Sequence, residues 1–275
     1  MRRRSSPIQY LPSYTLLIAI TILIVVPFIY MLSLSLQSEK EALGGDPPFL
    51  PAHAMFSNYA VVFKTTPFGR FVLNSIVVAG GITLAHLVLD PLAGYVFAKF
   101  RFPGREPLFV AVLSTLMLPF FVRMIPLYIM MASIHWLDTY QGLIVPFITS
   151  AFGIFLFRQF IRPLPDELLH AARIDGCSEI GVYIRIVLPQ IRPAMAANGL
   201  LTFIFQWNEF MWPLLATTTE TMRTIPVGLT LFTREYYALW NLMAVGAVVL
   251  FFPGLLVFLL FQRFLVRSMV LSGFR

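Results

Sequence analysis

The chain has 275 residues, of which 58% are hydrophobic and only 12% are charged. A soluble domain has an apolar share nearer half and a charged share nearer a quarter. This composition therefore excludes an ordinary soluble domain and indicates a protein that resides in a lipid bilayer. The formal net charge of +7 does not indicate nucleic-acid binding, because the basic residues flank the apolar stretches.

Six apolar windows are long enough to cross a bilayer, whose hydrocarbon core of about 30 Å needs roughly 20 helical residues. In chain order they are 14–36, 71–98, 107–131, 141–160, 193–216 and 241–262. The first is too long for a signal peptide and no small-residue cleavage site follows it, so we expect it to remain as a span. The sequence therefore predicts an all-α, polytopic membrane protein with six transmembrane helices in a single domain, 1–275.

Lysine and arginine positions predict the orientation of these spans, because cytosolic segments of membrane proteins carry more of both. With the N-terminus inside, 14 of the 20 basic residues lie in cytosolic segments, five lie outside and Arg123 lies within a span. We therefore expect both termini to be cytosolic. The segment 163–190, between the fourth and fifth spans, is then a cytosolic loop.

The loop 163–190 has the signals of a helical hairpin. Pro165 and the acidic residues after it favour a first helix that ends near Gly176, and Ser178 can begin a second helix that Pro189 would end. On the first helix four residues share one face, and its two alanines leave that face thin enough for another protein's backbone to approach. These residues are Leu168, Ala171, Ala172 and Asp175. Spacing alone leaves two readings open, a docking helix for a second protein or an amphipathic helix that lies at the membrane interface or connects the spans in solvent.

Polar side chains recur along the fifth window, where polar groups at membrane depth face the bundle interior or a water-filled path. The candidates for the translocation path or gate are Asn198, Thr202, Gln206, Asn208 and Glu209. The alternative is that these groups form hydrogen bonds between helices. Arg123 has the same predicted depth as Glu209, about 24 Å from the cytosolic start of its span at 1.5 Å per residue. We expect these two residues to pair or to share a cavity near the external gate.

Two other residues in the windows favour a structural interpretation. Asp90 precedes Pro91 and is expected to satisfy backbone groups freed by a kink rather than to line the path. Trp212 is expected to be an interface anchor, although a tryptophan can also stack on a sugar ring.

The stretch "HAARIDGCSEIGVYIRIVLP", from His170 to Pro189, resembles the cytosolic "EAA" signature of ABC-importer permease subunits. In that family the loop is a coupling helix that docks on an ATPase subunit. The resemblance implies this role for Glu167, His170, Ala171, Ala172, Asp175 and Gly176. His170 stands where the signature has glutamate, which leaves Glu167 as the nearest acid for a salt bridge to the ATPase.

Other stretches resemble the carbohydrate subfamily of these permeases, the maltose-type inner-membrane permeases. They are "GYVFAKFRFPGR" (94–105), "LDTYQGLIVP" (137–146), "FIFQWNEFMWPLL" (203–215) and "TIPVGL" (224–229). In those relatives the last stretch belongs to an external loop that reaches toward a sugar-binding protein. The implied contact residues are Thr224, Ile225, Pro226, Val227 and Gly228.

The sequence predicts no catalytic chemistry in this chain. Its four histidines lack metal-ligand spacing, and it has no G-x-x-x-x-G-K-[ST] loop to hold phosphate. The resemblance implies a type I ABC-importer permease fold in the inner membrane. It also implies a second, different permease subunit, two ATPase subunits that hold ATP and Mg²⁺, and an extracytoplasmic solute-binding protein.

The function that the resemblance implies is translocation of a sugar or sugar-like solute by alternating access. One competing hypothesis is an ion-coupled secondary transporter, against which the absence of a visible internal repeat argues weakly. Another is a membrane enzyme, for which we see no nucleophile next to a base.

Overall fold

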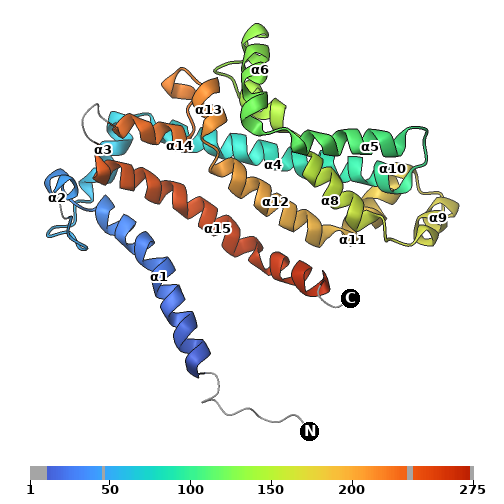
Figure 1. Cartoon of the computed structure of the whole chain (residues 1–275), viewed down its shortest axis with the longest axis horizontal. Coiled ribbons are helices and arrows are strands. Elements are labelled where there is room, and N and C mark those ends of the chain that lie inside the picture. The colour runs from blue at the N-terminus through green and yellow to red at the C-terminus, as the bar shows by residue number, and fades with distance from the viewer. Residues whose placement is uncertain (1–10, 45–46, 234–237, 273–275) are drawn as a thin grey trace. The chain divides into compact units, whose positions relative to one another are not determined.

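The computed structural model of the protein describes residues 11–44, 47–233 and 238–272 (Figure 1). These residues form helices and turns, with one isolated bridge between Thr233 and Ala238. The predicted all-α class is confirmed. The predicted cytosolic Arg2 to Arg4, the external Arg234 and the last three residues of the chain lie outside the described residues. The chain divides into two compact units, Met1–Thr66 with Leu229–Phe251, and Pro67–Gly228 with Phe252–Arg275.

The first unit contains the apolar helix α1 (Leu11–Ser35). Its other elements are α2 (Glu39–Leu43), α3 (Ser57–Thr65), η6 (Leu229–Phe232) and the first part of α15 (Trp240–Ser272). Asn58 of α3 holds the end of α1, because its side-chain amide donates hydrogen bonds to the carbonyl oxygens of Ser35 (2.9 Å) and Gln37 (2.8 Å). A buried amide of this kind fixes the chain where a long apolar helix ends.

The second unit is centred on α4 (Phe68–Lys99), against which α8 (Ala151–Ile161) and α12 (Arg192–Trp207) both pack (Figure 1). Buried positions of α4 recur every three or four residues, as expected for one face of a helix: Phe71, Ser75, Val78, Ile82, His86 and Asp90. The remaining helices before α12 are α5 (Arg105–Ser114), α6 (Phe120–Ser133), α7 (Tyr140–Ile144), α9 (Asp166–Ile174), α10 (Glu179–Val182) and α11 (Leu188–Gln190). After α12 come α13 (Met211–Ala216), η5 (Glu220–Met222) and α14 (Ile225–Gly228).

Two of the predicted spans are bent pairs of helices. In the third window, α5 with η2 (Thr115–Met117) meets α6 at 100°, and in the fourth, α7 with η3 (Val145–Phe147) meets α8 at 42°. Pro119 stands at the first bend and has no N–H to continue a helix. Among the described residues, α1, α4 and α15 are each long and apolar enough to cross a membrane, and counting each bent pair as one span raises the number to five.

The fifth window, 193–216, is not the single helix that its length and hydropathy predict. A break at 208–210 divides it into α12 and α13, and the 16 residues of α12 are fewer than the roughly 20 that a crossing needs. The side-chain amide of Asn208 donates to the carbonyl oxygen of Ile204 (2.8 Å) at the end of α12. The same carbonyl oxygen also accepts the backbone N–H of Asn208 (3.3 Å), so the side chain adds a second hydrogen bond to the last turn before the break.

Pro189 does not end the second helix of the hairpin, contrary to the prediction. α10 continues through a π-helical turn (η4, Tyr183–Val187) into α11, and Pro189 lies in the first turn of α11. A proline in an α-helix clashes with the carbonyl group four residues back. In the π-helical turn the N–H of Leu188 bonds to the carbonyl oxygen of Tyr183, five residues back, so the chain stays helical past the proline.

Trp212 lies in the core of the second unit, so the prediction of an interface anchor is wrong. Its side chain is 1% exposed, and its indole N–H donates to the carbonyl oxygen of Gly142 at 3.0 Å. Buried tryptophans usually need such an acceptor, and here α7 supplies it.

Candidate functional site

The hairpin, residues 163–190, exposes one face of a short helix, α9, on the surface of the protein. α9 leads to Gly176, whose φ of +85° lies in the left-handed region that glycine adopts without steric cost, which confirms the predicted turn. The exposed members of the predicted coupling set are Glu167, His170, Ala171, Asp175 and Gly176. Leu168 and Ile174 add apolar surface, and Ile174 is 87% exposed.

Ala172 does not belong to that outer surface, although the helical spacing predicts that it does. It is buried in a core cluster that also holds Tyr95 and Phe157. A short helix that packs against a core buries only one of its faces. On α9 the limit between the buried and the exposed face lies between Ala172 and Ala171. The residues of the predicted face that stay outside are Leu168, Ala171 and Asp175.

Lys99, the last residue of α4, fastens the start of the hairpin. Its ammonium group donates hydrogen bonds to the carbonyl oxygens of Arg162 (3.2 Å) and Leu164 (2.5 Å) and to Asp166 Oδ1 (2.7 Å). Only 6% of the Lys99 side chain is exposed, so this buried charge depends on its three acceptors. The hydrogen bond from Lys99 lowers the pKa of the Asp166 carboxyl group.

A second connection joins both helices of the hairpin to α4. Arg173 in α9 donates two hydrogen bonds, of 2.6 and 3.2 Å, to the carboxylate of Glu179 in α10. Tyr95 of α4 donates to the same carboxylate at 3.2 Å. The hydrogen bonds from Arg173 lower the pKa of Glu179, so the contribution of this ion pair is lost only in acid, as the pH falls through that lowered pKa.

Replacing Lys99 by methionine is expected to loosen the hairpin and leave the rest of the unit folded. Two carbonyl oxygens and Asp166 lose their donor, at a local cost of about 1–3 kcal/mol. Amide hydrogen exchange over 166–174 should become roughly tenfold faster or more, since about 1.4 kcal/mol corresponds to a factor of ten. Arg162→Met is the control, because the Arg162 side chain is exposed and its carbonyl oxygen remains an acceptor. Equal exchange in both variants would contradict the fastening role.

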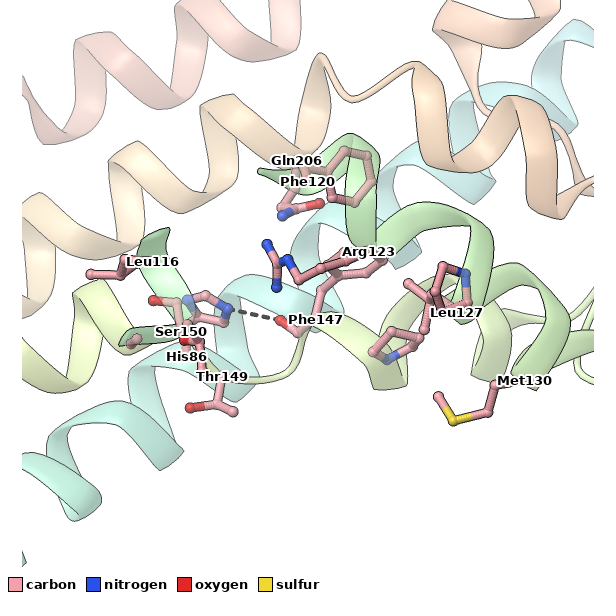
Figure 2. Close-up of a pocket in the computed structure, with 14 residues that line it drawn as sticks. His86, Leu116, Phe120, Arg123, Leu127, Met130, Phe147, Thr149, Ser150 and Gln206 are labelled. Carbon is pink, nitrogen blue, oxygen red and sulfur yellow. Dashed lines mark hydrogen bonds between the residues drawn. The ribbon is translucent and has the colours of Figure 1, made fainter. Parts of the chain in front are cut away.

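A cavity of about 470 Å³ lies in the second unit, beside the break between η3 and α8. Figure 2 shows Arg123 from α6, Gln206 from α12 and His86 from α4 around this cavity. Apolar side chains, among them Phe120 and Leu127, complete much of the wall. Small-molecule sites commonly have volumes of about 300–1,000 Å³, so the cavity is of a suitable size.

The cavity gathers only part of the predicted path set. Arg123 and Gln206 line it, whereas Asn198 and Thr202 are buried along α12 outside its lining, and Asn208 is exposed. Burial does not decide for the alternative of hydrogen bonds between helices, because the buried amide nitrogen of Asn198 has no hydrogen-bond partner among the described residues. A path role for Asn198, Thr202 and Asn208 stays a prediction.

Glu209 does not pair with Arg123, because its carboxylate caps the first backbone N–H groups of α13. Glu209 Oε1 accepts hydrogen bonds from the backbone N–H groups of Met211 (2.9 Å) and Trp212 (3.2 Å). No ion pair joins Arg123 and Glu209 in the part of the chain that the structure describes. Equal depth along two helices does not set the direction in which side chains point, which is why the pairing prediction is wrong.

Replacing Glu209 by alanine is expected to destabilise α13 by about 1 kcal/mol, the usual cost of losing a helix cap. Glu209→Gln is the matched control, because its amide oxygen can still accept both hydrogen bonds. The measurement is the heat-induced unfolding midpoint of the purified protein. A glutamine variant as unstable as the alanine variant would show that the charge matters, as an ion pair requires, and not the cap.

Asp90 and His86 of α4 clamp the break between η3 and α8. Asp90 is fully buried and accepts hydrogen bonds from the Thr149 hydroxyl (2.6 Å) and the backbone N–H of Ser150 (3.1 Å). His86 Nε2 lies 2.8 Å from the carbonyl oxygen of Phe147, so it donates to that oxygen. Asp90 therefore satisfies a freed backbone N–H, as expected, but this group belongs to the break in the neighbouring span and not to a kink at Pro91.

The segment 217–228, part of the segment 217–240 predicted to be external, is also fastened to α4. Asn74 donates from its amide nitrogen to the carbonyl oxygens of Thr221 (2.9 Å) and Arg223 (2.8 Å). Ser75 Oγ accepts a hydrogen bond from the N–H of Ile225 (2.9 Å). Of the predicted binding-protein contacts, Pro226 is half-buried, whereas Thr224, Ile225, Val227 and Gly228 are buried.

The exposed part of this segment is 218–221, just before the predicted contacts. Asp138 holds it, because its carboxylate accepts hydrogen bonds from the backbone N–H groups of Thr218 (2.8 Å) and Thr219 (2.9 Å) and from both hydroxyl groups. Burial acts to raise the pKa of Asp138, but these hydrogen bonds outweigh it and the pKa is lowered. Any protein that meets this segment from outside would touch 218–221 before the buried side chains.

Sequence reasoning missed Lys99, Asn74 and Asp138, which fasten the hairpin and the external segment. The sequence indicated Lys99 only as a cytosolic charge within the stretch 94–105, and Asp138 only as part of the stretch 137–146. The partners of Asp138, about 80 positions later, leave no local pattern.

Comparison with known proteins gives consistent results. The family described as "Binding-protein-dependent transport system inner membrane component" matches residues 91–271. The permease AraQ of an arabinooligosaccharide transport system from Bacillus subtilis is 34% identical over 88% of this chain and 86% of its own length. The permease UgpE of the sn-glycerol-3-phosphate transport system from Escherichia coli is 35% identical over 94% of this chain and 95% of its own length.

The fold is also similar to that of a solved structure. A chain of a bacterial ABC transporter involved in the import of the acidic polysaccharide alginate has a TM-score of 0.81 with 24% sequence identity. The match covers 96% of this chain and 98% of the other. At this identity the similarity concerns the fold.

Proposed function

Because this chain belongs to the family of binding-protein-dependent transport inner membrane components and is a non-catalytic permease subunit, we propose that it moves a sugar or sugar-like solute across the inner membrane by alternating access. The support for the solute class is that the relatives are named permeases of arabinooligosaccharide and sn-glycerol-3-phosphate transport systems. Each of them matches this chain over most of its length.

The observation that carries the proposal is the hairpin fastened to α4. The exposed face of α9 joins apolar Leu168 and Ile174 to acidic Glu167 and Asp175, a surface suited to a protein partner. Lys99 and Tyr95 connect this hairpin to the central helix of the unit. A partner that pushes on α9 therefore acts on α4 as well.

We propose that the partner at α9 is an ATPase subunit, and that two such subunits hold ATP and Mg²⁺. A second and different permease subunit and an extracytoplasmic solute-binding protein complete the assembly. The distribution of lysine and arginine in the sequence supports cytosolic termini and a cytosolic hairpin, on the side of the membrane where ATP is available. The exposed segment 218–221 is the proposed contact for the solute-binding protein.

Reconstitution into proteoliposomes tests the energy source. Uptake of radiolabelled solute should need ATP, the ATPase, the companion permease and the solute-binding protein, and should continue when an ionophore removes ion gradients. Uptake by this chain alone that the ionophore abolishes would instead establish an ion-coupled secondary transporter.

Cysteine cross-linking tests the docking face. In a Cys177→Ser background, Ala171→Cys should cross-link to the ATPase, since Ala171 is exposed. Ala172→Cys is the matched control, because the neighbouring side chain is buried and should not react. Equal cross-linking at both positions, or none at either, would contradict docking through this face.

A further inference from the structure

The cavity beside the break between η3 and α8 carries a positive charge without a carboxylate partner. Among the described residues that line it none is acidic, and no ion pair is formed by Arg123 in that part of the chain. Figure 2 shows the Arg123 guanidinium directed into the space between Gln206 and His86. A charged side chain within a spanning segment is costly, so it is usually paired or lines a functional path.

The nearby carboxylate of Asp90 does not supply that partner. Its oxygens are occupied by the donors of Thr149 and Ser150, and the side chain is fully buried beneath the cavity wall. Glu209, the other acid expected in this region, is engaged by two backbone N–H groups of α13. Asp90 and Glu209 therefore both bind other groups, and neither forms an ion pair with Arg123.

The chemistry of the cavity favours an anionic group. A guanidinium offers five N–H donors in a planar fork that fits the two oxygens of a carboxylate or phosphate. Gln206 and the hydroxyl groups of Thr149 and Ser150 add neutral polar groups that suit sugar hydroxyls. Phe120, Leu127 and other apolar side chains form the rest of the wall, and Arg123 is exposed in the single chain, so a solute can reach it.

We propose that this cavity is a solute subsite in which Arg123 binds a carboxylate or phosphate group, so that it determines specificity for an acidic sugar or a sugar-like phosphate ester. This rests on the proposed function, since it places a solute inside the permease. Gln206 lies next to the guanidinium (Figure 2). In the proposed complex its amide is placed to contact the uncharged part of the same solute.

The test measures binding to the assembled importer in nanodiscs of phosphatidylcholine, without its solute-binding protein. Saturation-transfer NMR compares galacturonate with galactose, and glycerol 3-phosphate with glycerol, so that each pair differs in the anionic group. At least one anion should bind roughly tenfold more tightly than its neutral counterpart, as expected for a charge-assisted bidentate contact. The pair that shows the preference identifies carboxylate or phosphate as the group recognised.

Three variants connect this preference to the site. Arg123→Gln should remove it, Arg123→Lys should retain part of it, and Arg70→Gln, which alters an exposed arginine outside the cavity, should leave it intact. No preference in the unaltered importer, or a preference that survives in Arg123→Gln, overturns the proposal. A preference that disappears when the nanodiscs contain phosphatidylglycerol also overturns it, because a lipid headgroup then occupies Arg123.

Failure of this proposal is distinguishable from failure of the proposed function. An importer that assembles with its ATPase and takes up solute with ATP, yet shows no anion preference, loses only the subsite. An importer that binds galacturonate through Arg123 but transports without ATP loses the proposed energy source and keeps the subsite.

Discussion

Valine in place of Gly176 is expected to let ATP hydrolysis continue while solute uptake falls about tenfold or more, since about 1.4 kcal/mol corresponds to a factor of ten. The turn after α9 holds Gly176 at φ +85°, which a β-branched residue adopts only with strain of about 1–3 kcal/mol. The strain falls on the connection between α9 and α10. The hairpin then shifts against α4, and the ATPase moves without moving the permease.

The cause of that loss is conformation and not lack of space. A Cβ on Gly176 would meet no atom within 4 Å, so a clash does not explain an effect. Gly176→Asn separates the two causes, because asparagine, like valine, adds a bulky side chain but tolerates the left-handed region. The asparagine variant should keep most of its uptake. Equal loss in both variants would mean that side-chain bulk at the docking surface, and not the turn, is responsible.

The measurement is a ratio of two rates in the same proteoliposomes. ATP hydrolysis and solute uptake are followed together, and coupling is the number of solutes moved per ATP. A valine variant with unchanged coupling would remove Gly176 from the mechanism. A variant in which both rates vanish would indicate that the ATPase no longer docks, which the Ala171→Cys cross-link would then detect as a lost product.

The elements that can be predicted from the sequence are those whose cause is local. Apolar length predicts α1, α4 and α15, and the glycine after a nine-residue helix predicts the turn of the hairpin. The all-helical class follows from the same apolar windows, because a chain in lipid must satisfy its backbone hydrogen bonds within helices. These predictions needed no knowledge of distant partners.

The predictions that failed depended on distant partners. Helical spacing places Ala172 beside Ala171, but it does not say where the buried boundary falls, which the core around Tyr95 and Phe157 decides. The sequence around Trp212 is typical of an interface anchor, because the acceptor of its indole N–H, the carbonyl oxygen of Gly142 in α7, lies 70 positions earlier in the chain. Hydropathy likewise cannot detect the break in the fifth span, since Glu209 stabilises it through two hydrogen bonds and no change in apolar content.

The cavity shows the same limit. The sequence predicts that Arg123 and Gln206 face the path, and the structure places both at one cavity. It does not predict the wall formed by Thr149 and Ser150, because that wall exists only where α4 holds open the break between η3 and α8. The geometry of this clamp is therefore the part of the site most worth testing.

Alanine in place of Gly153 is expected to disrupt the clamp and to destabilise the packing of α8 on α4. A Cβ on Gly153 would lie 2.7 Å from Cγ of Asp90, closer than real side-chain atoms approach. Asp90 is fully buried, so it cannot move aside into water. Displacing it breaks its charged hydrogen bonds to Thr149 and Ser150, which cost about 1.5–3 kcal/mol each.

The readouts are stability and transport. The unfolding midpoint, followed through the loss of helical circular dichroism on heating, should fall by several degrees, and uptake should fall because the cavity wall shifts. Gly80→Ala is the matched control, since Gly80 lies in α4 and a Cβ there would meet nothing within 4 Å. Similar midpoints for the two variants would contradict a close contact between α4 and α8 at this point.

A double-mutant cycle assigns the effect to Asp90. If the added methyl group acts by displacing the carboxylate, Gly153→Ala should cost much less in an Asp90→Ala background, where the space is already empty. Asp90→Ala alone also leaves the Ser150 N–H and the Thr149 hydroxyl without their acceptor, so it should itself be destabilising. Strictly additive costs would mean that Gly153 is needed for a reason unrelated to Asp90, although Asp90 would still hold the break through Thr149 and Ser150.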